Sequence, residues 1–159
     1  MGRIKAWPPE LNDDLDTIIQ AASLLKSTSA VGLRSLEKGN LILVKALFSH
    51  LEDAISNTEA AIQNIKDFYN PSAKGGRPVK WVTTIQEVEE QYLYDLLHSY
   101  QRLWECYQDN NWRCVKLYYQ NIPITCKQIR KSIEAIPREA YILSETRDII
   151  REAVQNGWD

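Results

Sequence analysis

The cationic side chains of this chain are collected in two stretches, an arrangement that favours local contact with a polyanion. The stretch Lys66–Lys80 carries four cations against one carboxylate, and the stretch Asn110–Arg138 carries six against one. The remaining segments are acidic, and the whole chain of 159 residues has a net charge of −2. Phosphate affinity comes from local cations, so a nearly neutral chain that sorts its charge in this way can still bind a phosphate backbone.

Eight of these cations are candidate contacts to a nucleic-acid backbone. They are Lys74, Arg77, Lys80, Arg113, Lys116, Lys127, Arg130 and Lys131. Lysines dominate the set and no residue is identified as a bidentate reader of bases, so we expect contacts to phosphates. The alternative interpretation is that both stretches are solvated surface, with cations that pair weakly with neighbouring acidic helices.

Segment 70–80 is predicted to be a basic loop between two helices, because it contains two prolines, two adjacent glycines and no apolar period. Within it, Gly76-Arg77-Pro78 resembles the core of the AT-hook, a short element that lies in the minor groove of A·T-rich DNA. The arginine that precedes this core in the AT-hook is replaced by Gly75. The resemblance implies contact with DNA, and the glycines would let the backbone approach a phosphate closely.

The second basic stretch is predicted to form two short helices, 112–120 and 125–135, joined by a turn at Pro123. Each helix gathers its cations on one face. In the second helix these cations and Glu134 follow the i, i+3, i+4 and i+7 spacing of neighbours on a helix surface. Two basic faces joined by a turn could follow a phosphate backbone.

Apolar residues recur with a helical period along nearly the whole chain, which predicts an all-α protein. We expect one domain over 1–159, an elongated antiparallel bundle of five or six helices. The first helix is expected to begin at Pro8-Pro9 and to end within 27–32; the others are expected over 41–69, 84–108, 112–120 and 125–135, with a last apolar face over 143–154.

Three local signals set the predicted boundaries of the two longest helices. Gly39 marks a break and Asn40 is a candidate N-cap for the helix over 41–69. Thr84 is expected to open the helix over 84–108, because its spacing to Glu87 is that of a capping box. These two helices have similar lengths and a single loop between them, so we expect them to pack as antiparallel partners.

Eight aromatic residues are concentrated between Tyr92 and Tyr119. Some must belong to the core, but Tyr94 falls off the apolar stripe, and Tyr118 and Tyr119 point to different sides of their helix. Three interpretations stay open for this group: the edge of the core, stacking on nucleic-acid bases, and anchoring of a protein partner.

The three cysteines are Cys106, Cys114 and Cys126, and their spacing matches no zinc-ligand pattern. An odd number of cysteines in a chain that starts without an apolar signal segment predicts reduced thiols and a cytoplasmic location. No apolar run approaches the roughly 20 residues of a membrane-spanning helix, so we expect no membrane contact.

No sequence motif indicates catalysis or cofactor binding. Asp95 and His98 form half of a di-metal helical motif, but the second copy and the further carboxylates are missing. Cys106 lies about two turns from His98 and could share a face with it, yet no oxyanion site accompanies the pair. We therefore expect no enzyme, no cofactor, no metal and no small-molecule substrate.

These features predict a non-enzymatic helical subunit that works with protein partners in a larger assembly and contacts DNA or RNA through local basic surfaces. The expected architecture is similar to that of the helical small subunits of CRISPR surveillance complexes, compact bundles that line a bound nucleic-acid strand. The alternative is a protein–protein adaptor or small regulator that makes no contact with nucleic acid.

Overall fold

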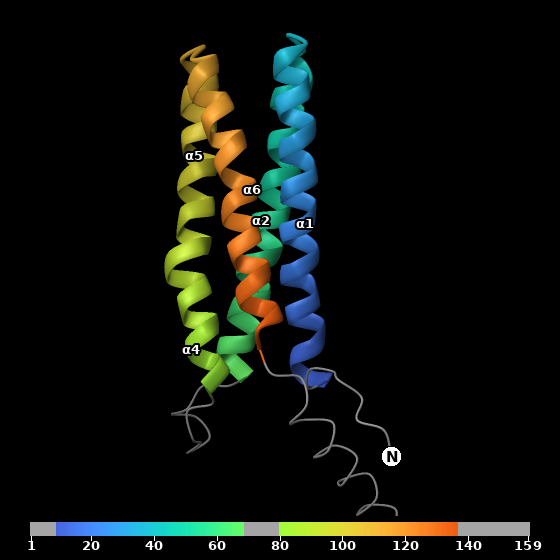
Figure 1. Cartoon of the computed structure of the whole chain (residues 1–159), viewed down its shortest axis with the longest axis vertical. Helices are drawn as coiled ribbons and strands as arrows, with labels where there is room; N and C mark the ends of the chain where they lie inside the picture. Colours follow the sequence, from blue (N-terminus) through green and yellow to red (C-terminus); the bar gives the residue numbers. More distant parts are fainter. Residues whose placement is uncertain (1–8, 69–79, 137–159) are drawn as a thin grey trace, which may run out of the picture.

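The chain folds into an up-and-down bundle of four antiparallel helical rods (Figure 1). A computed structural model describes residues 9–68 and 80–136. The rods are α1 (Pro9–Glu37), α2 (Leu41–Phe68), a third helix built from three consecutive segments, and α6 (Trp112–Glu134). The segments of the third helix are α4 (Lys80–Glu87), the π-helical η1 (Val88–Leu93) and α5 (Tyr94–Gln108). The all-α prediction is confirmed, whereas the predicted count of five or six helices does not match the four rods of the described residues.

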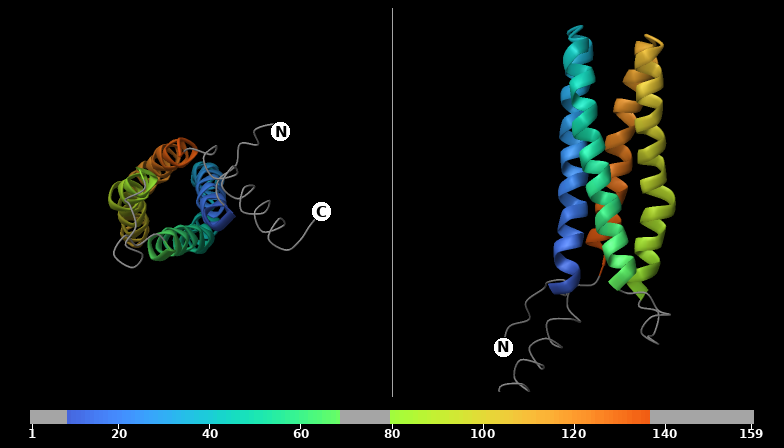
Figure 2. Two further views of the ribbon diagram at one scale, coloured as in Figure 1. Left: turned by 90° about the horizontal axis from the view of Figure 1, so that it is seen from below. Right: turned by 180° about the vertical axis from the view of Figure 1, so that it is seen from behind.

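The four rods form a ring in chain order, and α6 returns to pack against α1 (Figure 2). The expected antiparallel pairing of the helices over 41–69 and 84–108 is present between α2 and the third helix. However, α2 packs less closely against the third helix than the other neighbouring rods pack against each other. The bundle therefore has one comparatively open side.

The α1–α2 and α5–α6 turns are built in the same way, and the break and N-cap predicted at Gly39 and Asn40 are confirmed in the first of them. Gly39 and Asn110 have positive φ angles of 71° and 55°, which reverse the chain after each helix. The next residue caps the following helix: Asn40 Oδ1 accepts a hydrogen bond from Leu43 N (3.2 Å), and Asn111 Oδ1 accepts one from Cys114 N (3.2 Å).

Helix α1 continues through the segment 27–32, so the prediction that it ends there is wrong. Gly32 is buried and serves close packing rather than termination, since a Cβ at this position would lie 2.5 Å from Cε1 of Tyr119. The Tyr119 hydroxyl donates a hydrogen bond to the carbonyl of Val44 on α2 (3.1 Å). One buried side chain of α6 thus contacts both α1 and α2.

Helix α6 runs through Pro123, which corrects the prediction of two short helices over 112–120 and 125–135. Proline lacks the N–H that would bond to the carbonyl of Tyr119, but packing on both sides of it outweighs the loss. Tyr119, Ile122 and Cys126 are all buried on one continuous face. The predicted turn is therefore replaced by an uninterrupted rod of 23 residues.

The π-helical segment η1 accommodates a break in the apolar stripe of the third helix. Val88 and Leu93 are both buried although they are five residues apart, one more than an α-helical stripe allows. The helix already begins at Lys80, so the capping box predicted at Thr84 is wrong and Thr84 lies inside α4. The predicted apolar face over 143–154 lies outside the described residues.

Cys106 and Cys114 form a disulfide across the α5–α6 turn, so the prediction of three reduced thiols is wrong for this pair. The Cα atoms of the pair are 5.6 Å apart, a separation that a disulfide can bridge. Cys126 is a free, buried cysteine, and burial raises the pKa of its thiol to about 12.

The substitution Gly32→Ala should destabilise the protein by about 1–3 kcal/mol, because the added methyl group collides with the Tyr119 ring. The free energy of unfolding, measured by chemical denaturation, checks this. In a Tyr119→Leu background the ring is absent, and the additional cost of Gly32→Ala should be smaller. An equal cost in both backgrounds would show that the close contact does not constrain position 32.

Thiol counting checks the disulfide. Alkylation of the denatured, unreduced protein should modify one thiol per chain, that of Cys126, and prior reduction should raise the count to three. In the folded protein at about pH 8, Cys126 should react slowly, because its raised pKa leaves little of the reactive thiolate. Three modified thiols without reductant would contradict the disulfide.

Candidate nucleic-acid interface

The five predicted cations of the second basic stretch all lie on α6, and all five side chains are exposed. With 3.6 residues per turn, they fall within a sector of about 100° of the helix surface. From Arg113 to Lys131 the helix rises about 27 Å. The sequence predicts two separate basic faces, and the structure joins them into one. We call this set the basic face of α6; its members are Arg113, Lys116, Lys127, Arg130 and Lys131.

One member of the basic face is paired with a carboxylate. Arg130 Nε lies 2.9 Å from Glu134 Oε1, and both side chains are about half exposed. For the other four cations, no ion pair is found with the residues that the structure describes. The carboxylate that pairs with Arg130 belongs to α6 itself, so within the described residues no ion pair joins the basic face to a neighbouring acidic helix.

Two exposed apolar side chains lie beside the middle of the basic face. Leu117 is 51% exposed and Ile124 is 62% exposed, and both lie on the same side of α6 as Arg113 and Lys131. They place aliphatic surface between the cations near the middle of the helix. Such side chains can pack against sugars or against a protein, but they cannot form stacking platforms for bases.

A cation that the sequence did not single out lies beside this face. Lys26 of α1 lines a small pocket of about 60 Å³ together with Lys127 and Arg130. Lys26 belongs to the acidic N-terminal part of the sequence, so its segment gives no basic signal. Only the packing of α1 against α6 brings it to the other cations.

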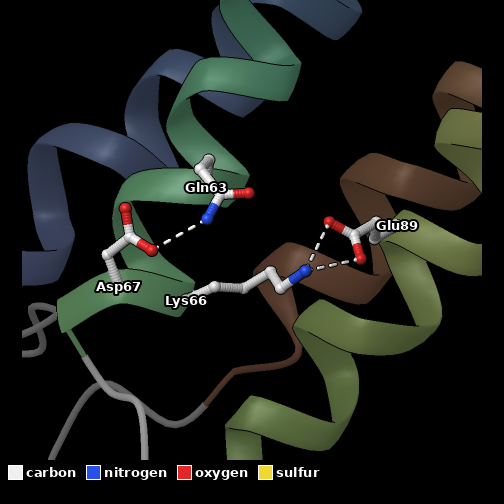
Figure 3. A network of polar contacts seen from close by, with 4 residues as sticks. All are labelled: Gln63, Lys66, Asp67 and Glu89. Carbon is white, nitrogen blue, oxygen red and sulfur yellow. Dashed lines mark hydrogen bonds and ion pairs between the residues drawn. The ribbon is translucent and has the colours of Figure 1, made fainter. Parts of the chain in front are cut away.

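The first basic stretch is described only in part. Lys66 is engaged in an ion pair: its Nζ lies 2.9 and 3.1 Å from the two carboxylate oxygens of Glu89. Figure 3 shows this side chain reaching from α2 to the third helix, while Gln63 donates to Asp67 within α2 (2.8 Å). Lys66 therefore bridges two helices of the bundle.

The three candidate residues of that stretch give little geometry. Lys74 and Arg77 lie outside the described residues. Lys80 is the first residue of α4, at the end of the bundle where α6 also ends (Figure 1), and its side chain is not described. The structure thus places the start of α4 near the Lys131 end of the basic face.

The aromatic residues are used mainly inside the bundle. Phe48 forms edge contacts with Trp104 and Tyr107, with ring centroids 4.9 and 5.6 Å apart. Tyr107 contacts Trp112 in the same way, at 5.5 Å, and donates a hydrogen bond to the carbonyl of Leu41. Among the Phe, Tyr and Trp side chains of the described residues, Tyr94 is the exposed one, at 66%.

His98 and Cys106, which the sequence analysis considered for catalysis, are engaged in contacts within the bundle. The His98 ring contacts the edge of Tyr118, which also receives the guanidinium of Arg102 over its face. Cys106 is held in the disulfide, so it is not a free nucleophile beside His98. Within residues 9–68 and 80–136, no group of three His, Cys, Asp or Glu side chains is placed to hold a metal ion.

Comparison of the chain with known protein families, with curated proteins and with solved structures finds no match in any of the three. None of the helices in the described part combines the length and apolar character needed to cross a membrane. The class that the structure defines is an up-and-down four-helix bundle with one basic helix.

Proposed function

We propose that this chain is a non-enzymatic helical subunit of a larger nucleic-acid-handling assembly, and that the basic face of α6 contacts a DNA or RNA backbone. The observation that carries the proposal is the line of exposed cations along about 27 Å of one continuous helix. Arg130 alone among them has a carboxylate partner within the described residues. Cations that lack such partners can release counterions from phosphates and gain affinity.

The proposal is limited to the phosphate backbone. Sequence-independent stacking needs aromatic faces beside the cations, whereas the exposed Tyr94 lies on the third helix, next to Asp95. The basic face offers lysines, arginines and aliphatic side chains. Contact should therefore depend on charge and on salt rather than on base identity.

Three further parts of the proposal rest on the sequence: a second phosphate contact, protein partners and the location. Lys74, Arg77 and Lys80 form a second backbone contact, and protein partners hold the subunit in place. The proposed location is the cytoplasm. The Cys106–Cys114 disulfide weighs against a strongly reducing compartment, and thiol counting on protein whose thiols are trapped during lysis tests the location.

A specific observation favours the adaptor alternative, because Leu117 and Ile124 give the basic face an apolar centre. An acidic, apolar protein partner would use both features. Replacing both residues by Ser should leave affinity for nucleic acid within about threefold if phosphate contact dominates. A larger loss on every oligonucleotide would instead show that the aliphatic centre is part of the contact.

Neutralising cations of the basic face should weaken binding in a salt-dependent way. Each of Lys127→Ala and Lys131→Ala should lower affinity about equally on different sequences and reduce the salt slope by roughly one unit. The measurement is affinity for single-stranded and duplex oligonucleotides across a salt series. Lys45→Ala removes an exposed cation from α2 and is the matched control, which should leave the slope unchanged. Equal effects of all three substitutions would contradict a contact localised on α6.

The substitution Glu134→Gln should strengthen binding, in contrast to the lysine variants. It removes the carboxylate that pairs with Arg130 and frees a guanidinium for phosphate contact. The salt slope should rise by roughly one unit, because one more cation takes part. Glu59→Gln on α2 removes an exposed carboxylate far from α6 and controls for the change in net charge. An unchanged slope for Glu134→Gln would exclude Arg130 from the interface.

A further inference from the structure

We infer that the open side of the bundle, between α2 and the third helix, is a docking groove for a basic amphipathic helix of a partner protein. It lies on a different face from the cations of α6, so the inference does not depend on nucleic-acid contact. It identifies instead the chemistry of the partner that the proposed assembly would supply.

Two cavities lie one after the other along this side of the bundle. The first, of about 390 Å³, extends along α2 from Ile42 to Glu52 and faces Tyr100 and Trp104. The second, of about 540 Å³, extends from Ser56 to Gln63 and faces Leu93 and Leu97. Both follow the interface at which the rods pack least closely. Together they cover about 32 Å along α2, the length of a helix of roughly 20 residues.

The walls of this groove suit a helix. Ala46, Ser49, Ser56 and Ala60 line the α2 side, and their short side chains let a backbone approach closely. On the α2 side Ile42, which is 85% exposed, supplies apolar surface. On the other side Tyr100 and Trp104 of the third helix supply it. An amphipathic helix that enters such a groove buries apolar anchors spaced by three and four residues.

The charges around the groove favour a partner with positive charge. Glu52 and Glu59 line it and have no ion-pair partner among the described residues, and Glu89 lines it paired with Lys66. Lys45 is the one cation among the lining residues that the structure describes. Lys66 lies just beyond Gln63, and its ion pair with Glu89 bridges the two helices at this end of the groove (Figure 3). A second copy would bring the same excess of carboxylates over lysine to the groove, which disfavours self-pairing. A helix with lysines or arginines beside its apolar stripe would pair with them.

The polar contacts at one wall already hold the groove in shape. Trp104 Nε1 donates to the Tyr100 hydroxyl (2.7 Å), and that hydroxyl donates to Glu52 (3.2 Å). Burial raises the pKa of Tyr100, so the hydroxyl keeps its proton and remains a donor. The Glu52 carboxylate is thus held at the rim and is exposed to a docking cation.

The test uses the full chain and a designed Leu/Lys helical peptide of about 20 residues with a seven-residue repeat, at a concentration at which the peptide is monomeric. A Leu/Glu peptide of the same pattern is the charge control. Binding is measured by titration calorimetry, and its location is mapped by amide chemical shifts. The Lys peptide should bind and perturb Ala46, Ala60 and Leu97, and the Glu peptide should not bind.

Two matched pairs of variants make the test specific. The double substitution Glu52→Lys/Glu59→Lys should weaken binding of the Lys peptide by about tenfold or more. The control Asp13→Lys/Asp16→Lys on α1 makes the same change in net charge and should alter the affinity by less than about threefold. Ala60→Trp should block the groove sterically, while Asn57→Trp, at an exposed position outside the lining residues, should not. Circular dichroism confirms that each variant is folded.

Several results would overturn the inference. If the two charge-reversal pairs weaken binding of the Lys peptide equally, the binding is only a general attraction between a cationic peptide and an acidic protein. Shifts that map to another face, or no binding, would remove the docking groove. A dimer of the chain alone that Ala60→Trp dissociates would show that a second copy occupies the groove. None of these results bears on the salt slope of α6, so the two proposals fail separately.

Discussion

The contact between the Tyr119 ring and the backbone of Gly32 is the constraint on which the arrangement of this bundle depends. The ring lies against α1 because position 32 has no Cβ, and the hydroxyl reaches the carbonyl of Val44 on α2. Burial raises the pKa of Tyr119, so the hydroxyl remains a protonated donor. One side chain thereby fixes α6 against two other helices, and the exposed side of α6, with its cations, is left toward solvent.

The sequence predicts best the parts of the fold that local chemistry decides. The Gly39-Asn40 and Asn110-Asn111 turns combine a residue that accepts positive φ with a capping side chain, and both signals act within a few residues. Gly32 and Pro123 carry equally strong local signals, yet neither ends a helix. At these positions tertiary packing around Tyr119 and Cys126 outweighs local preference, and packing partners cannot be identified from spacing along one chain.

The candidate site, like the fold, is predictable from the sequence only where the residues involved are close together along the chain. The cations of α6 are visible in the sequence because they are close together along the chain. Their union into one face depends on the continuity of α6 at Pro123. Lys26 lies beside the basic face because its helix, α1, packs against α6. Lys66 forms an ion pair with Glu89, 23 residues away, and is therefore not free to bind a phosphate. Charge patterning therefore finds cations, while the fold decides which of them have partners.

The bundle separates two surfaces of opposite character that a net charge of −2 conceals. The cations of α6 lie on one side, and the carboxylates of α2 and the third helix line the groove on another. Under the two proposals above, the chain would need no strong phosphate affinity of its own. A partner helix held in the groove would keep α6 at a high effective concentration beside any nucleic acid carried by the same assembly. Few phosphate contacts would then suffice, and the acidic half of the bundle would limit binding to nucleic acid elsewhere.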